Sequence, residues 1–330
     1  MRNGINRRQF CAAAAAVGLA PSAVAQAGDW PKARPVRIVA TGVAGAGTDI
    51  YARLFAEQYA KIFGQSFIVE NRPGANGAIG NDVVAKAAPD GYTLLWSYAA
   101  AIAVNAALFP KLPYDTLKDL QPIAQVGSGG NMLMVAPDLP VKDLKEFVAL
   151  VKASPGKYDY GSWGVGSGGH LSMEALATQA GLKMNHVPYR ATAALAQDMM
   201  GGVIKIGFLA VETAQVLHKA GKGRPIAISG TRRAPNMTDI PTMTEQGFKF
   251  DIDAWYCLMA PGGTPMPIVR RLNEETNRLL QDPAMGQRLV ALNFAMPAPI
   301  KTVEQFTQTI RDDIDTWSKV IKAANIKPEG

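Results

Sequence analysis

Short apolar runs alternate with longer amphipathic segments over the first two thirds of the chain. The apolar runs suit buried strands, and the segments between them place apolar residues every three or four positions, as helices do. The predicted strands are 37–40, 67–69, 93–98, 132–136, 158–160, 184–187, 203–208 and 225–229, and the predicted helices are 49–62, 76–87, 143–153, 170–180, 193–200 and 212–220. This alternation predicts an α/β fold of parallel sheets covered by helices.

The last third of the chain has a different pattern. One extended apolar run at 255–260 is followed by helical stretches at 265–281, 283–292 and 303–324. Thr302 and Gln305 have the spacing of a capping box at the start of the last helix. Its apolar positions recur every three or four residues, so we expect this helix to cover the core.

Two crossings between two lobes are predicted from the extended segments. Segments 121–126 and 131–136 are separated by a glycine-rich stretch, and 255–260 belongs to the other half of the chain. If the chain leaves one lobe through the first pair and returns through the third, the predicted lobes are 28–127 plus 252–330, and 128–251. The strand-to-helix loops of both lobes would then face a shared cleft.

Three glycine- and alanine-rich loops each follow a strand and open a helix, at 42–49, 71–77 and 161–170. Bare N–H groups at helix starts form a nest for a negative group. The first loop lacks the lysine that a triphosphate requires, and 164–169 matches G-x-G-x-x-G without an acidic residue about 20 positions later. The loops therefore predict an anion site, and no cofactor is expected.

Residues 1–27 have the pattern of an export signal. Arginines at 2, 7 and 8 precede an apolar run at 10–20 that is too short to span a membrane, and cleavage is expected after Ala25 or Ala27. The segment around Arg7 and Arg8 is similar to a twin-arginine signal, although Asn6 replaces the usual Ser or Thr. An ordinary secretory signal is the alternative, and both predict a periplasmic protein.

Charge and cysteine content limit the function classes. The formal charge of +7 falls when the three arginines of the signal are removed, and no basic run is present. This balance argues against nucleic acid and is compatible with an anionic small ligand. Cys257 alone remains after the signal, which excludes an internal disulfide, and we expect it in the core.

The histidines and the first-loop acid have structural explanations beside functional ones. The chain has three histidines, and none has a second ligand at metal spacing, so no metal site is expected. Ser167 and His170 lie three apart, but a nucleophile elbow would need glycine in place of Val165. We expect His170 to bond to loop backbone. Asp49 either caps its helix or shapes the preceding loop.

Arg190, Tyr98 and Trp163 are further candidates for a binding site. Arg190 follows a predicted strand and has a planar fork that fits a carboxylate, or it is a solvated surface residue. Tyr98 and Trp163 lie next to strands, where aromatic residues either line a pocket or pack in the core.

Short sequence motifs follow one another in a fixed order through residues 30–326. They include Pro35–Val39, Ala44–Ile50, Val69–Gly77, Ala88–Leu95, Leu112–Asp115, Gly166–Leu171, His186–Arg190 and Ala260–Pro265. On these blocks the chain resembles the TctC or Bug family, the periplasmic substrate-binding proteins of tripartite tricarboxylate transporters. The resemblance implies a two-lobed, Venus-flytrap α/β fold with two crossing segments as hinge. It implies a monomer that closes on a small carboxylate, a dicarboxylate or an aromatic acid, and delivers it to membrane transporter subunits.

The resemblance also implies which residues face the ligand. By position in the matching blocks they are Val43, Ala44, Gly45, Ala46, Gly47, Asp49, Ser97, Tyr98, Gly166, Ser167, Gly168, His170, Tyr189, Arg190, Ala191, Thr192, Phe208 and Leu209. No catalytic residue is implied, so an enzyme is not expected.

Departures from the family pattern make the expected cleft narrower and more apolar. Ala46 and Ala191 replace usual glycines, Leu209 stands where many members place a polar residue, and Trp163 and Tyr256 are bulkier than usual. We hypothesise a ligand less polar than citrate. A periplasmic sensor that feeds a membrane two-component kinase, and an exported hydrolase that uses Ser167 and His170, are the alternatives.

Overall fold

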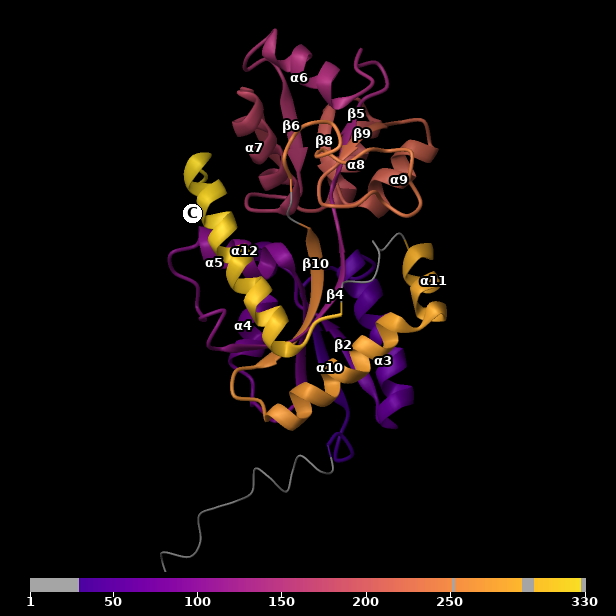
Figure 1. Ribbon diagram of the computed structural model, residues 1–330, viewed down its shortest axis with the longest axis vertical. Coiled ribbons are helices and arrows are strands. Elements are labelled where there is room, and N and C mark those ends of the chain that lie inside the picture. The colour runs from indigo at the N-terminus through magenta and orange to yellow at the C-terminus, as the bar shows by residue number, and fades with distance from the viewer. Residues whose placement is uncertain (1–29, 251–252, 293–299, 328–330) are drawn as a thin grey trace, which may run out of the picture.

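Two five-stranded sheets, each with its own helices, form two lobes stacked along the long axis of the molecule (Figure 1). The computed structural model describes residues 30–250, 253–292 and 300–327. The predicted export signal lies outside the described residues. The two-lobed α/β class expected from the sequence is confirmed.

The first lobe is built on the sheet β2-β1-β3-β10-β4. Strands β1 (Val36–Ala40), β2 (Phe67–Asn71) and β3 (Thr93–Tyr98) are parallel. Strand β10 (Ala254–Pro261) is antiparallel to both β3 and β4 (Leu120–Gly129). The helical segments of this part of the chain are α3 (Gly47–Phe63), η1 (Ala75–Gly77), α4 (Ala78–Ala85), η2 (Ala100–Val104), α5 (Asn105–Leu108), α10 (Met266–Gln281) and α11 (Pro283–Ala291).

The second lobe is built on the sheet β7-β6-β8-β5-β9. Its strands are β5 (Met132–Val135), β6 (Asp159–Ser162), β7 (Asn185–Pro188), β8 (Ile206–Leu209) and β9 (Arg224–Ile228). Its helices are α6 (Leu144–Lys152), α7 (Gly168–Ala180), α8 (Thr192–Met200) and α9 (Val211–Lys219). Strand β6 is parallel to β7 and β8, whereas β5 is antiparallel to β8 and β9.

The expectation of parallel sheets is wrong for one strand in the middle of each sheet. Strand β5 enters the second sheet from the first lobe, and β10 enters the first sheet from the second lobe. Each enters at the opposite end from the strands that follow covering helices, so it runs against its neighbours. The antiparallel direction of β5 and β10 results from the order in which the chain connects the two lobes, and the amino-acid composition of these strands does not determine it.

The cores consist of the apolar residues that the alternation placed on the inner faces. In the first lobe Phe55, Tyr59 and Trp96 are fully buried together between α3 and the sheet. Cys257 is also fully buried, as the sequence predicted. In the second lobe, Phe147 and Tyr160 are fully buried in the corresponding core. Burial of such aromatic side chains holds the strand ends, and therefore the loops, in fixed positions.

Gly130 lies at the first crossing, between β4 and β5. A Cβ at this position would lie 1.3 Å from the carbonyl oxygen of Ser229, so only glycine fits. The Ser229 N–H donates to the Asn131 carbonyl, and the Asn131 N–H donates to Ser229 Oγ. These bonds hold the crossing against the second lobe. The lobe limits 28–127 plus 252–330, and 128–251, stay a prediction.

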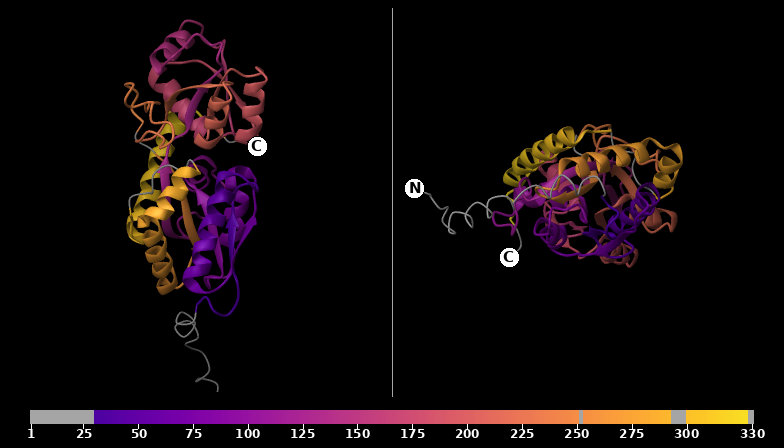
Figure 2. Two further views of the ribbon diagram at one scale, coloured as in Figure 1. Left: turned by 90° about the vertical axis from the view of Figure 1, so that its right-hand side faces the viewer. Right: turned by 90° about the horizontal axis from the view of Figure 1, so that it is seen from below.

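Helix α12 (Val303–Ala323) runs along both lobes (Figures 1 and 2). Its predicted capping box is present: Thr302 Oγ1 accepts from the Gln305 N–H, and Gln305 Oε1 accepts from the Thr302 N–H. Phe306 packs edge-on against Trp255 in the first lobe. Further along, Trp317 joins an apolar cluster with residues of the second lobe. The expected cover is therefore shared by the two lobes.

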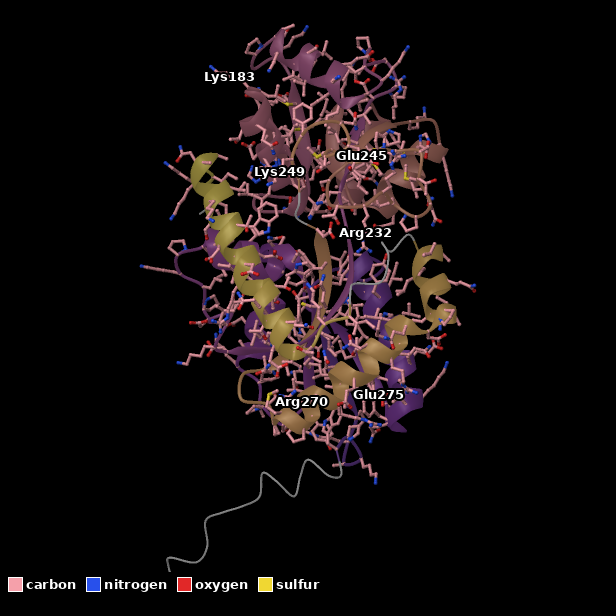
Figure 3. The ribbon with its side chains drawn as sticks, in the orientation of Figure 1. Lys183, Arg232, Glu245, Lys249, Arg270 and Glu275 are labelled. Atoms are coloured by element: carbon pink, nitrogen blue, oxygen red, sulfur yellow. The ribbon has the colours of Figure 1, made fainter. Side chains whose placement is uncertain are left out.

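Charged side chains of both signs are spread over the outside of the molecule, as Figure 3 shows. Arg270 bonds to Glu304 at 2.9 Å between α10 and α12, and Arg233 bonds to Glu245 at 3.0 Å in the second lobe. Among the described residues, no helix combines the length and the hydropathy that crossing a membrane requires.

Candidate functional site

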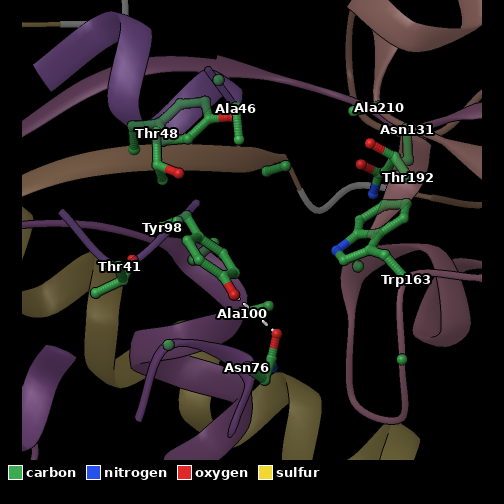
Figure 4. A pocket seen from close by; sticks show the side chains of 18 of the residues that line it. Thr41, Ala46, Thr48, Asn76, Tyr98, Ala100, Asn131, Trp163, Thr192 and Ala210 are labelled. Carbon is green, nitrogen blue, oxygen red and sulfur yellow. Dashed lines mark hydrogen bonds between the residues drawn. The ribbon is translucent and has the colours of Figure 1, made fainter. Parts of the chain in front are cut away.

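A cleft of about 820 Å³ lies between the lobes and is lined by residues of both. Figure 4 shows Ala46, Thr48 and Tyr98 on one wall, with Trp163 and Thr192 on the opposite wall. Both walls consist of loops at the ends of strands and the helix starts that follow them. The predicted shared cleft is present.

In the described part of the chain, three helices that begin at the cleft have alanine at the N-cap and no side-chain cap. The N-cap residues of α3, α8 and α9 are Ala46, Ala191 and Ala210, and none of them has a side chain that accepts from the first turn. All three alanines line the cleft. The first N–H groups of a helix have no partner within the helix, and they give its start a partial positive charge.

Other helices have side-chain caps, including α7, which also begins at the cleft and whose N-cap Ser167 accepts from the His170 N–H. Asp143, Asp282 and Thr302 each accept from an N–H in the first turn of α6, α11 and α12. Helix α10, which begins after Pro265 away from the cleft, has no such cap. Alanine is a poor cap, so three alanines at the cleft cost helix stability. This cost leaves N–H groups at the cleft open to an acceptor from outside the protein.

Asp49 shapes the first loop from behind. Its Oδ2 accepts from the Gly45 N–H at 2.9 Å, and its Oδ1 accepts from Arg53 Nε at 2.9 Å. Burial raises the pKa of Asp49, but the hydrogen bonds from Arg53, Gly45 and Asn71 outweigh it, and the pKa is lowered overall. Asp49 therefore points into the loop, which was one of its two open interpretations.

Gly42 allows the first loop to fold tightly. A Cβ on Gly42 would lie 1.8 Å from Thr48 Oγ1, a side chain that occupies that space and itself lines the cleft. Asn71 Nδ2 donates to the Gly42 carbonyl at 3.0 Å. The loop is thus held by side chains on its outer side, and its inner side faces the cleft.

The eighteen residues predicted to face the ligand fall into two groups in the structure. Those that line the cleft are Val43, Ala46, Gly47, Tyr98, Gly168, Tyr189, Arg190, Ala191 and Thr192. Those outside the cleft lining are Ala44, Gly45, Asp49, Ser97, Gly166, Ser167, His170, Phe208 and Leu209. Several of the second group support the walls: Ser97 bonds to Asn81, and Phe208 and Leu209 are fully buried. A contact of any of them with a ligand stays a prediction.

The Ser167 hydroxyl and the His170 ring do not hydrogen-bond to each other, because each has other partners. Ser167 Oγ accepts from the His170 backbone N–H at 3.3 Å and donates to Ser162 Oγ at 3.2 Å. His170 Nδ1 accepts from the Gly166 N–H at 3.1 Å, so His170 bonds to loop backbone as the sequence predicted. The hydrogen bonds of the loop occupy both groups, and no serine–imidazole pair forms between them.

His170 and His186 stack beneath the cleft with ring centroids 4.1 Å apart. Burial lowers the pKa of His170 to about 4, and burial together with the neighbouring His170 lowers the pKa of His186 to about 3. His186 Nε2 lies 2.7 Å from Ser162 Oγ. Both imidazoles are therefore neutral at pH 7, and they form a rigid base for the α7 loop.

Asn76 connects the walls of the cleft and was missing from the predicted site. It has a left-handed backbone (φ 48°), and its Oδ1 accepts from the Tyr98 hydroxyl at 2.9 Å. Its Nδ2 donates to Asn105 Oδ1 at 3.0 Å and to the Gly166 carbonyl of the second lobe at 3.3 Å. The Asn76-Gly77 pair in the second glycine loop was a usable signal, because asparagine tolerates this conformation.

Asn131 and Glu212 also line the cleft and were not predicted. Asn131 follows the first crossing, and Glu212 is in the first turn of α9. Burial raises the pKa of Glu212. The position of each side chain depends on how the lobes face each other, and no local sequence pattern records this.

Aromatic side chains form much of the cleft wall. They are Tyr51, Tyr98, Phe109, Trp163, Tyr189, Phe250, Trp255, Tyr256 and Trp317. Tyr51 and Tyr256 pack edge-on with ring centroids 5.1 Å apart. Such walls favour a ligand with an apolar body, and the helix starts favour a negative end.

Comparison with known proteins agrees with this geometry. Residues 51–326 match the family described as "Tripartite tricarboxylate transporter family receptor". The chain is 34% identical over 301 residues to "Protein BugT" of Bordetella pertussis, covering 91% of this chain and 92% of that protein. The family match includes strands of both sheets and begins after the first loop of the cleft.

Solved structures of similar proteins have the same fold. "R. palustris Rpa4515 with adipate" has a TM-score of 0.83 and 30% identity, covering 91% of this chain and all of that chain. "MatC (Rpa3494) from Rhodopseudomonas palustris with bound malate" has a TM-score of 0.78 and 32% identity, covering 88% and 99%. With its fold, cleft and family match together, this chain belongs to the tripartite tricarboxylate transporter family receptors, which are periplasmic solute-binding proteins.

Proposed function

We propose that this receptor binds a small organic carboxylate in the interlobe cleft and delivers it, unaltered, to the membrane subunits of a tripartite transporter. The observation that carries the proposal is the set of three uncapped helix starts at Ala46, Ala191 and Ala210. A carboxylate has the charge and the acceptor oxygens that these N–H groups require. The adipate and malate named for two similar structures belong to the same chemical class.

The ligand is a dicarboxylate or an aromatic acid with an apolar body. This follows from the aromatic cleft wall and from Trp163 and Tyr256, which fill space that a bulky, highly charged ligand would need. The nine predicted residues that line the cleft contact the ligand, and the nine behind them hold the loops. Export with cleavage after Ala25 or Ala27 brings the monomer to the periplasm.

Binding of a panel of acids tests the proposal. We expect adipate, succinate, benzoate or terephthalate to raise the melting temperature of the purified protein, and calorimetry to give a single site per chain. A bound ligand stabilises the folded state by mass action, so the shift increases with concentration. Stabilisation by citrate alone would contradict the apolar ligand class, and no response to any acid would contradict the proposal.

The variant Ala191→Asp tests the role of the helix starts. An aspartate cap offers its own carboxylate to the N–H groups of α8, so we expect ligand affinity to fall tenfold or more, while the free protein is stabilised by about 1 kcal/mol. The matched control is Asp143→Ala, which removes a cap from α6, away from the cleft. It should lower stability by a similar amount and leave affinity unchanged.

A further inference from the structure

Glu212 brings a carboxyl group into a cleft that is otherwise built for an anion. It is in the first turn of α9, and part of its side chain is exposed to the cleft. Its Oε1 lies 3.3 Å from the point where a Cβ on Gly47 would be. Gly47 is the first residue of α3, on the other lobe. Glu212 therefore reaches across the cleft to the start of a second helix.

Tyr256 completes this end of the cleft. Its hydroxyl lies 2.8 Å from the same point above Gly47. Burial raises the pKa of both Tyr256 and Tyr51, and the negative charge of Glu212 raises it further. One carboxyl group and one phenol thus face the same small volume. Because Gly47 has no side chain, both groups can approach the start of α3 this closely, and both line the cleft.

The three uncapped helix starts are therefore not equivalent. Glu212 lies at the starts of α9 and α3, and its charge offsets the positive ends of both helices there. The start of α8, next to the exposed Arg190, is left for the ligand carboxylate. A second anionic group on the ligand would meet Glu212 instead of a free helix start.

Glu212 forms no salt bridge with a lysine or an arginine in the described part of the chain. A partly buried carboxylate without a cationic partner is costly, and burial accordingly raises its pKa. The carboxylate has a hydrogen bond from its own backbone N–H, and a donor group on the ligand would add the partner from the cleft side. A hydrogen bond to a charged group also contributes more than one between neutral groups.

We propose that Glu212 and Tyr256 form an acceptor subsite that selects monocarboxylates bearing an N–H or O–H donor at the far end and disfavours dicarboxylates. The inference rests on the proposed function and narrows its ligand class, because it favours monocarboxylates over the dicarboxylates that the proposed function also includes. The carboxylate of the ligand binds at the start of α8, and its ammonium, amine or hydroxyl group binds to Glu212 on the side where Glu212 lines the cleft.

Two matched ligand series test this subsite by calorimetry. The first is hexanoate, 6-aminohexanoate and adipate, and the second is benzoate, 4-aminobenzoate and terephthalate. Within each series only the far end changes, from apolar to donor to carboxylate. We expect the amino acid of at least one series to bind about tenfold more tightly than its unsubstituted parent, and the dicarboxylate of that series to bind more weakly than the amino acid.

The variant Glu212→Gln should reverse this order. It keeps the size and removes the charge, so the amino acid should lose about tenfold in affinity and the dicarboxylate should gain. The control is Glu274→Gln, which makes the same change of net charge at an exposed position of α10 and should leave all six affinities unchanged.

The outcomes separate this inference from the proposed function. If acids bind but the far end makes no difference, or if Glu212→Gln leaves the order unchanged, the acceptor subsite is wrong and the receptor function stands. If none of the six acids binds, the proposed function fails and the subsite fails with it.

Discussion

His170 and His186 are the residues whose charge state the fold controls most directly. His170 is buried and His186 is partly buried, and their pKa values of about 4 and 3 lie below the ordinary value of 6.5. Below pH 6.5 the unfolded chain takes up protons that the folded protein does not bind. The stabilising contribution of the pair is therefore complete above pH 6.5 and is lost as the pH falls towards 4 and 3.

Asp313 acts in the opposite direction. Burial raises its pKa to about 6, although the hydrogen bond from Trp255 Nε1 lowers it. Between pH 6 and 4 the folded protein binds a proton at Asp313 that the unfolded chain does not, so acid stabilises the fold through this group. The two histidines outweigh it, because each of the three groups changes stability by about 1.4 kcal/mol per pH unit.

We predict a lower melting temperature at pH 5 than at pH 7 for the unmodified protein. His186→Gln should reduce this difference, and Asp313→Asn should increase it, because it removes the opposing proton. Scanning calorimetry at the two pH values measures all three differences. Equal differences in the three proteins would show that neither group controls the acid response.

At the helix starts, the residues that best stabilise a helix differ from the residues that best suit ligand binding. Thr302 and Gln305 form the capping box that their spacing predicts, and the helix behind them spans both lobes. At the cleft, by contrast, alanines occupy the cap positions of α3, α8 and α9. A cap stabilises its own helix, whereas an absent cap keeps N–H groups for a ligand.

Removal of the Thr302 cap should be measurable. We predict that Thr302→Ala lowers the free energy of unfolding by about 1 kcal/mol, because the first turn of α12 loses its acceptor. Thr307→Ala removes a hydroxyl that donates to the Val303 carbonyl within the same helix and should change stability by less than about 0.5 kcal/mol. Denaturant titration compares the two, and equal losses would contradict a capping role.

Much of the element order could be predicted from the sequence, and strand direction could not. Predicted strand 93–98 coincides with β3, and predicted helix 143–153 overlaps α6. Apolar periodicity is a local property of the sequence, so it indicates both the strand and the helix. The helical segments at Ala100–Leu108 were not predicted, because that stretch is apolar except for Asn105 and has no helical periodicity.

The sequence predicted which loops form the candidate site, but it did not predict every side chain that lines the cleft. Glycine- and alanine-rich helix starts marked Ala46, Gly168 and Ala191, which line the cleft. Glu212 and Asn131 could not be placed, because each belongs to the cleft only through the way the two lobes face each other. Sequence spacing describes one strand-loop-helix unit at a time, and a cleft requires several.

At the scale of the whole molecule, Asn76 is a contact that holds the lobes together beside the cleft. Its hydrogen bond to the Gly166 carbonyl links the first lobe to the second, and its bond with Tyr98 holds its side chain in place. The equilibrium between open and closed forms depends on a small difference in free energy. The loss of a single interlobe hydrogen bond can therefore change the populations several-fold.

We predict that Asn76→Gly shifts the ligand-free protein towards a more open form. Glycine keeps the left-handed backbone at no steric cost, so the change removes the side-chain bonds alone. X-ray scattering should show a larger radius of gyration, and ligand affinity should fall. Ala75→Gly is the control, since Ala75 has a similar backbone (φ 47°) and no side-chain hydrogen bond to lose. If both variants scatter like the parent, Asn76 does not control closure.

The position of β10 between β3 and β4 has a consequence for the order of folding. All strands of the second sheet, from Met132 to Ile228, leave the ribosome before β10 does. During that time β3 and β4 have no common neighbour, and their facing edges are exposed to other chains. The second lobe can therefore complete its sheet first, whereas the first sheet is incomplete until residues 254–261 join β3 to β4.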